Sequence, residues 1–245
     1  MKFKFIFPFI IKFMQSVNQV VLLAGGKGTR MREMTEDLPK PMVRIGNFPV
    51  LDHLMKIFNN FGEFKFIVCT GYLEEKIREY YKNKDGVEVV FTGIETQTGG
   101  RIKKIADKLD DNFIVTYGDG LANVNINNLI DFHFSQNTIG TMTVTNPTSR
   151  FGLVEFNNNK LVERFVEKPK LQGFVNIGFM VFKNKFLEYL DSNSVLESNP
   201  LTNLASAGEL SAYIHDGYFE PMDTYREYLN MNKLLKSGNP PWNNF

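Results

Sequence analysis

The stretch VVLLAGGKGTR, residues 20–30, decides the fold of this chain. It opens with an uninterrupted apolar run over residues 20–24, which is typical of a parallel strand covered on both faces. Glycines at positions 25, 26 and 28 follow directly, where they let the backbone approach a ligand closely and direct several N–H groups at phosphate oxygens. The stretch therefore predicts an α/β fold with an anion-binding loop after its first strand.

Beyond this loop, short apolar runs alternate with helical periodicity. Apolar residues at 51, 54, 55 and 58 mark a helix. Strands are expected over residues 65–70, 86–91 and 113–117, and further helices over residues 73–81 and 102–109. Because each strand is followed by a crossover helix, we expect a doubly wound, mainly parallel, Rossmann-like sheet.

The second half of the chain is less regular. Strands are expected over residues 141–145 and 175–182, a hairpin over 153–156 and 161–165, and helices over 126–133, 186–190, 200–207 and 225–235. No linker rich in Pro, Gly or Ser separates the two halves. We therefore expect residues 18–245 to form a single domain, in which a smaller β-rich portion continues the sheet and covers a substrate.

The composition excludes several classes of protein. The 28 Lys and Arg residues are balanced by 27 Asp and Glu residues, so no surface of bulk positive charge is available for a nucleic-acid partner. The single cysteine, Cys69, excludes an internal disulfide and a multi-cysteine metal site, which fits the cytoplasm. Its surroundings, FIVCT, are typical of a buried strand; a catalytic thiol is the alternative, although no histidine lies nearby in sequence.

The first residues, MKFKFIFPFIIKF, differ from the rest of the chain. Their apolar run, Phe5 to Ile11, contains Pro8 and is much shorter than the ~20 residues that span a bilayer. No small-residue cleavage site follows, so a signal peptide is not favoured. We expect no membrane span, and we interpret residues 1–17 as an N-terminal extension, with Met14 as a possible true start.

Two familiar phosphate-binding loops do not fit the GGKGTR stretch. A dinucleotide fingerprint starting at Gly26 needs a third glycine where Met31 stands, which argues against a dinucleotide-dependent oxidoreductase. A Walker loop using Gly26 and Lys27 needs Ser or Thr where Gly28 stands. Phosphate binding is still favoured over a turn that merely uses glycines, because basic residues follow closely at Arg30, Arg32, Lys40 and Arg44.

Several motifs resemble those of a known family. LLAGGKGTRM, LPKPM and IGNFPVL look like the signature of the sugar-phosphate nucleotidyltransferases, and TGGRIKKI, TYGDG, RFG, EKP, NIGFMVF and GYFEPMDT recur in the family's order. The resemblance runs from Gln19 to the C-terminus and is greatest to the branch that transfers a cytidylyl group from CTP to glucose 1-phosphate. That branch makes CDP-glucose and pyrophosphate, and it implies a role in deoxysugar and surface-polysaccharide (O-antigen) biosynthesis.

The resemblance implies a set of site residues and partners. CTP, or another nucleoside triphosphate, would be surrounded by Leu23, Ala24, Gly25, Gly26, Lys27, Gly28, Thr29, Arg30, Lys40, Thr96, Arg101 and Gly118. A sugar 1-phosphate would be held in the β-rich portion by Gly152, Glu167, Lys168 and Asn176. Asp119 and Asp223 would bind Mg²⁺, and catalysis would rest on Arg30, Lys40, Asp119 and Asp223. A homo-oligomer is also implied.

The residues themselves support part of this assignment. Mg²⁺ prefers one or two carboxylates together with phosphate oxygens and water, and Asp119 follows an apolar strand at the end where α/β folds bind ligands. The alternatives are a turn aspartate for Asp119, a helix N-terminal carboxylate for Asp223 and a solvated surface lysine for Lys168. A bound Mg²⁺ with Arg30, Lys40, Arg101 and Lys168 offers about six positive charges, against about six negative charges on the two substrates.

No general base is required for such a reaction. A phosphate monoester with a second pKa near ~6 is already ionised at neutral pH, so a sugar phosphate can attack without losing a proton to the enzyme. We therefore expect His53 and His133 to be packing or surface residues of helices, and His215 to be a strand residue.

Two alternatives remain open at this point. The same fold could use another nucleotide, such as UTP or dTTP, or another sugar 1-phosphate; and the chain could be a non-catalytic regulatory module that binds nucleotide sugars. The segment between Tyr81 and Thr98 is shorter than in the cytidylyl branch, and it lies next to the expected base pocket.

Overall fold

The computed structural model describes residues 17–244. The expected N-terminal extension therefore lies outside the described residues except for Val17, which is buried in the core. Among residues 17–244, no helix is both long enough and apolar enough to cross a membrane.

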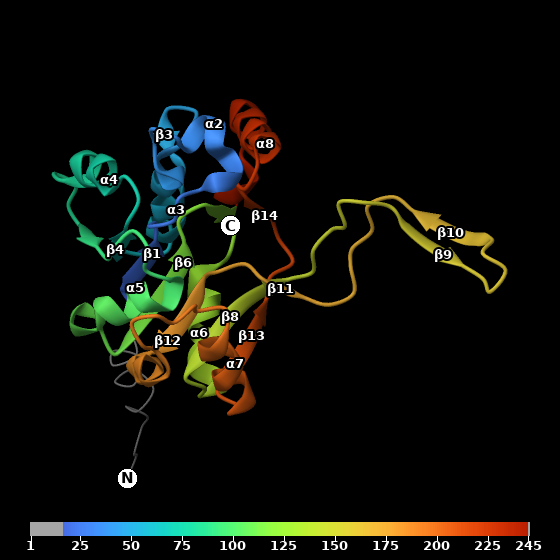
Figure 1. The fold of residues 1–245 in the computed structure, drawn as a ribbon. Helices are drawn as coiled ribbons and strands as arrows, with labels where there is room; N and C mark the ends of the chain where they lie inside the picture. The colour runs from blue at the N-terminus through green and yellow to red at the C-terminus, as the bar shows by residue number, and fades with distance from the viewer. Residues whose placement is uncertain (1–16, 245) are drawn as a thin grey trace, which may run out of the picture.

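An eight-stranded mixed sheet forms the centre of the molecule (Figure 1). Its strands run in the order β11-β8-β12-β6-β1-β4-β5, and β13 pairs with β8. Strands β6, β1, β4 and β5 are parallel, as are β13 and β8, whereas β12 is antiparallel to both β6 and β8. The strands are β1 (Gln19–Leu23), β4 (Lys65–Thr70), β5 (Val87–Phe91), β6 (Asn112–Tyr117), β8 (Gly140–Thr145), β11 (Val175–Asn176), β12 (Met180–Lys183) and β13 (Leu210–Ile214). The expected mainly parallel, doubly wound architecture is confirmed.

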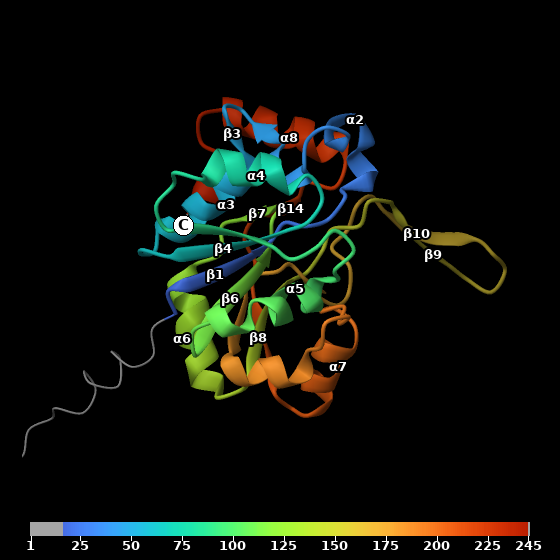
Figure 2. The same ribbon diagram turned by 60° about the vertical axis from the view of Figure 1, so that its left-hand side comes forward.

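Both faces of the sheet are covered, which explains the continuous apolar run of β1. Val20 and Leu22 belong to one core, whereas Val21 and Leu23 belong to the other. The first core is covered by α3 (Val50–Asn59), α4 (Glu74–Tyr81), α6 (Ile126–Gln136) and α8 (Tyr225–Lys236). The second is covered by α5 (Thr98–Lys104), the 3-10 helix Asn184–Tyr189 and α7 (Asn199–Ser206) (Figure 2). Burial of alternate side chains on opposite faces therefore fixes the position of β1 in the middle of the sheet.

The helix expected over residues 102–109 begins earlier and is divided into two parts. Helix α5 begins at Thr98 and ends at Lys104, so it contains the TGGR motif, and a separate 3-10 turn covers Ala106–Lys108. A β-carbon on Gly99 would lie 2.9 Å from the Ser194 carbonyl oxygen. The two glycines have low helix propensity, but they allow the first turn of α5 to pack closely against residues 192–194. Tertiary packing thus places a helix where its local sequence does not predict one.

The prediction of one continuous strand over residues 175–182 is also wrong. Gly178 and Phe179, with φ angles of +80° and +51°, interrupt it and separate β11 from β12. Left-handed residues cannot continue a strand, so the chain bulges here, and β11 and β12 pair with the same edge of β8 in registers that differ by two residues. Strand β13 was not expected, and His215 follows that strand instead of lying within it. His53 and His133 are buried helix residues, as expected.

A long hairpin projects from the body of the molecule. Strands β9 (Leu153–Phe156) and β10 (Val162–Val166) pair in antiparallel fashion, as expected, and both views show this ribbon extending away from the central sheet (Figures 1 and 2). We call residues 148–174 the hairpin arm. The remaining elements are α2 (Arg32–Thr35), β2 (Arg44–Ile45), β3 (Phe48–Pro49), β7 (Gly120–Ala122) and β14 (Phe219–Pro221), with 3-10 turns at Thr29–Met31, Lys40–Met42 and Pro241–Asn243.

Candidate active site

A cleft of about 490 Å³ opens at the carboxyl ends of β1 and β6. All of the residues expected at the nucleotide line it, as do Asp119 and Asp223. The cleft is also lined by residues that the sequence did not indicate, namely Pro41, Ile94, Glu95, Gln97, Thr98 and Tyr117. The structure therefore brings the expected nucleotide and metal residues together in one place.

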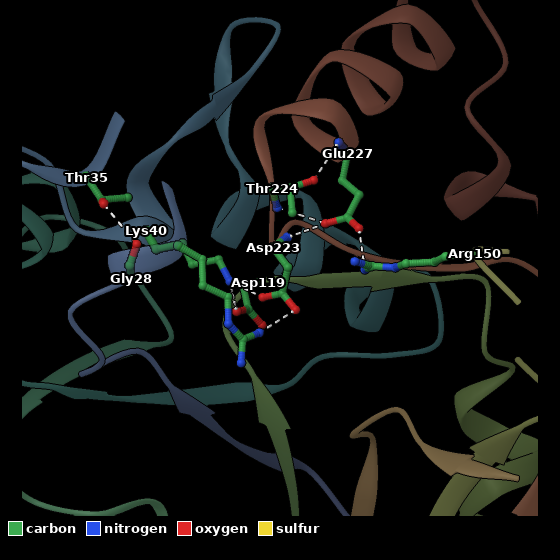
Figure 3. Close-up of polar contacts among 9 residues, drawn as sticks. Gly28, Thr35, Lys40, Asp119, Arg150, Asp223, Thr224 and Glu227 are labelled. Carbon is green, nitrogen blue, oxygen red and sulfur yellow. Dashed lines mark hydrogen bonds and ion pairs between the residues drawn. The ribbon is translucent and has the colours of Figure 1, made fainter. Parts of the chain in front are cut away.

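Lys40 lies between the two carboxylates at the centre of this cleft (Figure 3). Its Nζ donates to Asp119 Oδ2 at 2.6 Å and to Asp223 Oδ1 at 2.7 Å. Arg30 Nη1 donates to the other oxygen of Asp223 at 3.0 Å. The Lys40 side chain is only 11% exposed, whereas that of Arg30 is 75% exposed. One buried cation and one exposed cation thus hold the same carboxylate.

The pairing of two short strands brings Asp119 and Asp223 together. Asp119 precedes β7 and Asp223 follows β14, and these strands pair with Gly120 opposite Pro221. The Met222 N–H also donates to the Asp119 carbonyl oxygen at 2.8 Å. The backbone therefore fixes the spacing of the two carboxylates, although they are more than a hundred residues apart in sequence.

The ion pairs shift the pKa values of these groups. Burial tends to raise the pKa of Asp223, but the hydrogen bond and charge of Lys40, with Arg30 and Arg150, outweigh burial and lower it. Burial tends to lower the pKa of Lys40, but its bonds to Asp119 and Asp223 outweigh burial and raise it. Both groups are consequently held in their charged forms at neutral pH.

The glycines of the loop serve different purposes. A β-carbon on Gly25 would collide with the guanidinium group of Arg101, and Gly28 has a φ of +62°. Gly26 has open space where its side chain would be, so the cleft is accessible at this position. Thr35 Oγ1 donates to the Gly28 and Met31 carbonyl oxygens, both at 3.0 Å, and holds the end of the loop. Only part of the glycine pattern therefore concerns a ligand.

Arg101 is a buried clamp between loops. Its Nη1 donates to Thr70 O at 2.8 Å, Thr92 Oγ1 at 2.7 Å and Gly93 O at 2.8 Å, and its Nη2 donates to Gly25 O at 3.0 Å. Burial lowers the pKa of the Arg101 guanidinium. Its terminal nitrogens thus donate to neutral protein groups, which position the guanidinium but leave its positive charge uncompensated beside the cleft.

The wall opposite the glycine loop comes from the short segment before α5. Thr96 Oγ1 donates to Thr92 O at 2.7 Å and accepts a hydrogen bond from Lys104 Nζ at 3.0 Å. Lys27 Nζ and Glu95 Oε1 lie 2.6 Å apart, so an exposed ion pair joins the two sides of the cleft. The segment that the sequence marked as short thus forms a compact, hydrogen-bonded wall.

The four residues expected at the sugar phosphate do not line this cleft. Asn176 lines a neighbouring hollow, which shares Tyr117 with the cleft, and its Nδ2 donates to Tyr117 Oη at 3.4 Å. Gly152, Glu167 and Lys168 lie at the root of the hairpin arm, where Lys168 is 59% exposed and has a φ of +48°. The four residues therefore lie in two separate places, and Asn176 is the one that lines a hollow adjoining the nucleotide cleft.

Comparison with known proteins agrees with this geometry. Residues 19–220 match the family described as nucleotidyl transferase. The chain belongs to this nucleotidyl transferase family. It is 37% identical over 251 residues to a probable glucose-1-phosphate cytidylyltransferase of Bacillus subtilis (strain 168), and 38% identical over 253 residues to the glucose-1-phosphate cytidylyltransferase of Salmonella typhimurium (strain LT2). Each alignment covers 91% of this chain and 98% of the relative.

Solved structures share the fold. HddC from Yersinia pseudotuberculosis superposes with a TM-score of 0.69 at 24% identity, covering 89% of this chain and 99% of the other. A putative glucose-1-phosphate thymidylyltransferase from Bacillus anthracis gives a TM-score of 0.71 at 17% identity, covering 88% and 94%. The chain therefore shares the fold of both structures over most of its length.

The donor set of this nucleotidyl transferase fits a divalent cation. Asp119 and Asp223 already converge on one cation, the ammonium of Lys40. No cluster of three or more His, Cys, Asp or Glu side chains suited to a metal occurs within residues 17–244. Two carboxylates are nevertheless what Mg²⁺ takes from a protein when phosphates and water complete its coordination.

The alternative of a catalytic thiol does not fit the enzyme. Cys69 is fully buried in the second core, and burial raises the pKa of its thiol to about 12. Two residues that the sequence analysis did not indicate, Arg150 and Glu227, lie beside Asp223. The spacing of Thr224 and Glu227 is that of a capping box, a signal that was available in the sequence.

Proposed function

We propose that this nucleotidyl transferase transfers a cytidylyl group from CTP to glucose 1-phosphate, yielding CDP-glucose and pyrophosphate. The observation that carries the proposal is the cluster of Lys40, Asp119 and Asp223 in a cleft that faces the GGKGTR loop. The choice of CTP and glucose 1-phosphate is supported by the two cytidylyltransferase relatives, which align over most of this chain.

The proposed reaction is a direct displacement at phosphorus. An oxygen of the sugar 1-phosphate attacks the α-phosphorus of CTP, a new P–O bond forms, and the bond to the bridging oxygen of pyrophosphate breaks in line with it. The N–H groups of the loop and the side chain of Arg30 would receive the negative charge of the departing pyrophosphate. The nucleophile is already ionised at neutral pH, so no side chain has to remove a proton.

Asp119 and Asp223 would hold Mg²⁺, which supplies positive charge to the phosphate oxygens when it is bound. Lys40 adds a fixed cation at the same point, and the turn that carries it is held rigid by Pro39 and Pro41. The chain's own contribution is positioning and charge neutralisation, which are the main sources of acceleration in phosphoryl transfer.

The sugar phosphate would lie beside the nucleotide cleft. The neighbouring hollow, lined by Tyr117, Asn176 and Glu197 among others, has a volume of about 480 Å³. Gly152, Glu167 and Lys168, at the root of the hairpin arm, are proposed to contact the sugar phosphate from the other side. We further propose that the enzyme is cytoplasmic and homo-oligomeric, and that its product supplies deoxysugar and surface-polysaccharide synthesis.

The proposal is tested by measuring pyrophosphate release with Mg²⁺, pairing CTP, UTP, dTTP, ATP and GTP with glucose 1-phosphate and its isomers. We expect CTP with glucose 1-phosphate to give the highest kcat/KM. A higher kcat/KM with another pair of nucleoside triphosphate and sugar 1-phosphate would support the proposed reaction but overturn the assignment of its substrates. Nucleotide-sugar binding without turnover for any pair would instead favour a regulatory module.

A further inference from the structure

Glu227 lies directly behind Asp223 at the start of helix α8 (Figure 3). Its Oε2 accepts the backbone N–H of Asp223 at 2.7 Å and that of Thr224 at 2.8 Å. The Glu227 side chain is only 14% exposed. One carboxylate oxygen thus holds two successive backbone groups, and the first belongs to a proposed metal-binding residue.

The second oxygen of Glu227 is also occupied. Arg150 Nη2 donates to Glu227 Oε1 at 2.8 Å. Arg150 lies at the root of the hairpin arm, two residues before Gly152, so the ion pair joins the arm to helix α8. A continuous line of contacts runs from Arg150 through Glu227 and Asp223 to Lys40.

This arrangement constrains the part of the chain that carries Asp223. The segment between β14 and α8 contains only Met222, Asp223 and Thr224. Each of its three backbone N–H groups donates to a defined oxygen: that of Met222 to Asp119 O, and the other two to Glu227 Oε2. Removing Glu227 would release two of these three anchors while leaving every proposed ligand in the chain.

We propose that Glu227 is a positioning residue that sets the Asp223 carboxylate for the divalent cation, and that Arg150 assists by fixing Glu227. The inference rests on the proposed function, in which Asp223 binds the cation. A purely structural role is the competing explanation, since Thr224 and Glu227 form a capping box that stabilises a helix end in its own right.

The test compares Glu227→Ala, Glu227→Gln and Arg150→Ala with Asn125→Ala. Asn125 is a matched control because its side chain caps α6 by accepting the Asn128 N–H at 3.0 Å, away from the cleft. Three quantities are measured: the Mg²⁺ concentration that gives half-maximal pyrophosphate release, the Kd for Mn²⁺ in the presence of CTP without sugar phosphate, and the Tm. The Mn²⁺ titration, followed by the EPR signal of free Mn²⁺, involves no turnover.

Glu227→Ala should raise the half-saturating Mg²⁺ concentration and the Kd for Mn²⁺ by about tenfold or more, as is usual when a residue that orients a metal ligand is lost. Glu227→Gln retains an acceptor for the backbone and should recover part of this loss. Arg150→Ala should have a smaller effect, roughly two- to fivefold, because its ion pair is partly exposed. Asn125→Ala should lower the Tm without changing either metal constant.

The proposal is overturned if Glu227→Ala lowers the Tm as Asn125→Ala does while both metal constants stay at their wild-type values. Failure of the proposed function gives a different result, because wild-type protein would then release no pyrophosphate with any substrate pair. The Mn²⁺ titration still decides the role of Glu227 in that case, since it compares binding alone.

Discussion

The guanidinium group of Arg101 lies against Gly25, in the space that a side chain at that position would fill. Its Nη2 donates to the Gly25 carbonyl oxygen at 3.0 Å. Arg101 belongs to the first turn of α5, which is distant in sequence from Gly25. This contact therefore joins the start of a helix to the loop after β1. The shape of the phosphate loop therefore depends on a residue whose Nη1 and Nη2 groups donate to the protein itself.

Gly25→Ala should destabilise the protein, whereas Gly26→Ala should not. The alanine methyl group at position 25 would overlap the buried guanidinium, and overpacking of this kind costs about 1–3 kcal/mol. At position 26 nothing lies within 4 Å of the added carbon. Urea unfolding midpoints compare the two variants with the wild type, and equal midpoints for both would contradict the proposed contact.

Arg101→Met should lower the stability of the protein, whereas Arg30→Ala should lower its activity and leave its stability almost unchanged. Losing Arg101 leaves the Gly93 carbonyl oxygen without its donor, at about 1–3 kcal/mol. The Gly25 and Thr70 oxygens keep backbone N–H donors from other residues. Losing the exposed Arg30 should change the unfolding free energy by less than about 1 kcal/mol, yet slow pyrophosphate release. Unfolding and kinetics are measured on the same samples; a stable Arg101→Met protein would show that the clamp is not needed.

Lys40→Met should lower kcat/KM by more than tenfold. The substitution removes a buried ammonium that makes two charge-assisted bonds, each contributing about 1.5–3 kcal/mol. Lys82→Met is the control, because Lys82 forms an exposed pair with Glu79 at the C-terminal end of α4. Near-normal turnover of Lys40→Met with CTP and glucose 1-phosphate would remove Lys40 from the mechanism.

Asp223→Asn should abolish Mg²⁺-dependent pyrophosphate release, since the amide keeps the shape of the side chain but removes the charge that a cation requires. Asp216→Asn, a change at an exposed position nearby in sequence, should leave the rate unchanged. The two rates are compared over a range of Mg²⁺ concentrations. Recovery of full activity in Asp223→Asn at any of these concentrations would speak against a direct ligand.

The stability of the protein should fall as pH is lowered from about 6.5 toward 4, in part because of His133. Burial lowers the pKa of this histidine to about 4, from an unfolded value near 6.5. Between these values the unfolded chain binds the proton more readily, so acid favours unfolding by at most about 1.4 kcal/mol per pH unit. His133→Gln should reduce the slope of unfolding free energy against pH, and an unchanged slope would exclude His133 as the cause.

The sequence was most informative where local pattern and burial agree. The strand over residues 65–70 has the expected bounds, and the apolar run before the glycine loop is the covered strand β1. Both strands depend on periodicity, which a single sequence records directly. Asp119 and Asp223 meet as the family resemblance implied, but the pairing of β7 with β14 that brings them together was not predicted.

Other features depend on contacts between distant segments. The TGGR motif requires its two glycines because residues 192–194 leave no room for a β-carbon beside the first turn of α5. Whether Arg101 faces solvent or a buried set of carbonyl oxygens is decided by β4 and the loop after β5. The pairing of Arg150 with Glu227 joins residues 77 positions apart. Local propensity contains no information on such contacts, so these assignments required the fold.

The cluster that Lys40 and Arg30 form with Asp119 and Asp223 has a further electrostatic consequence. Two positive and two negative side chains sum to zero, and all four are joined by hydrogen bonds or ion pairs. A bare triphosphate therefore meets a cluster with no net charge. Lys27 is paired with Glu95, so Arg101 supplies the surplus positive charge among the described side chains that line the cleft. A triphosphate that arrives with its own divalent cation is a better electrostatic match, so the cluster would favour the metal-nucleotide complex over the free nucleotide.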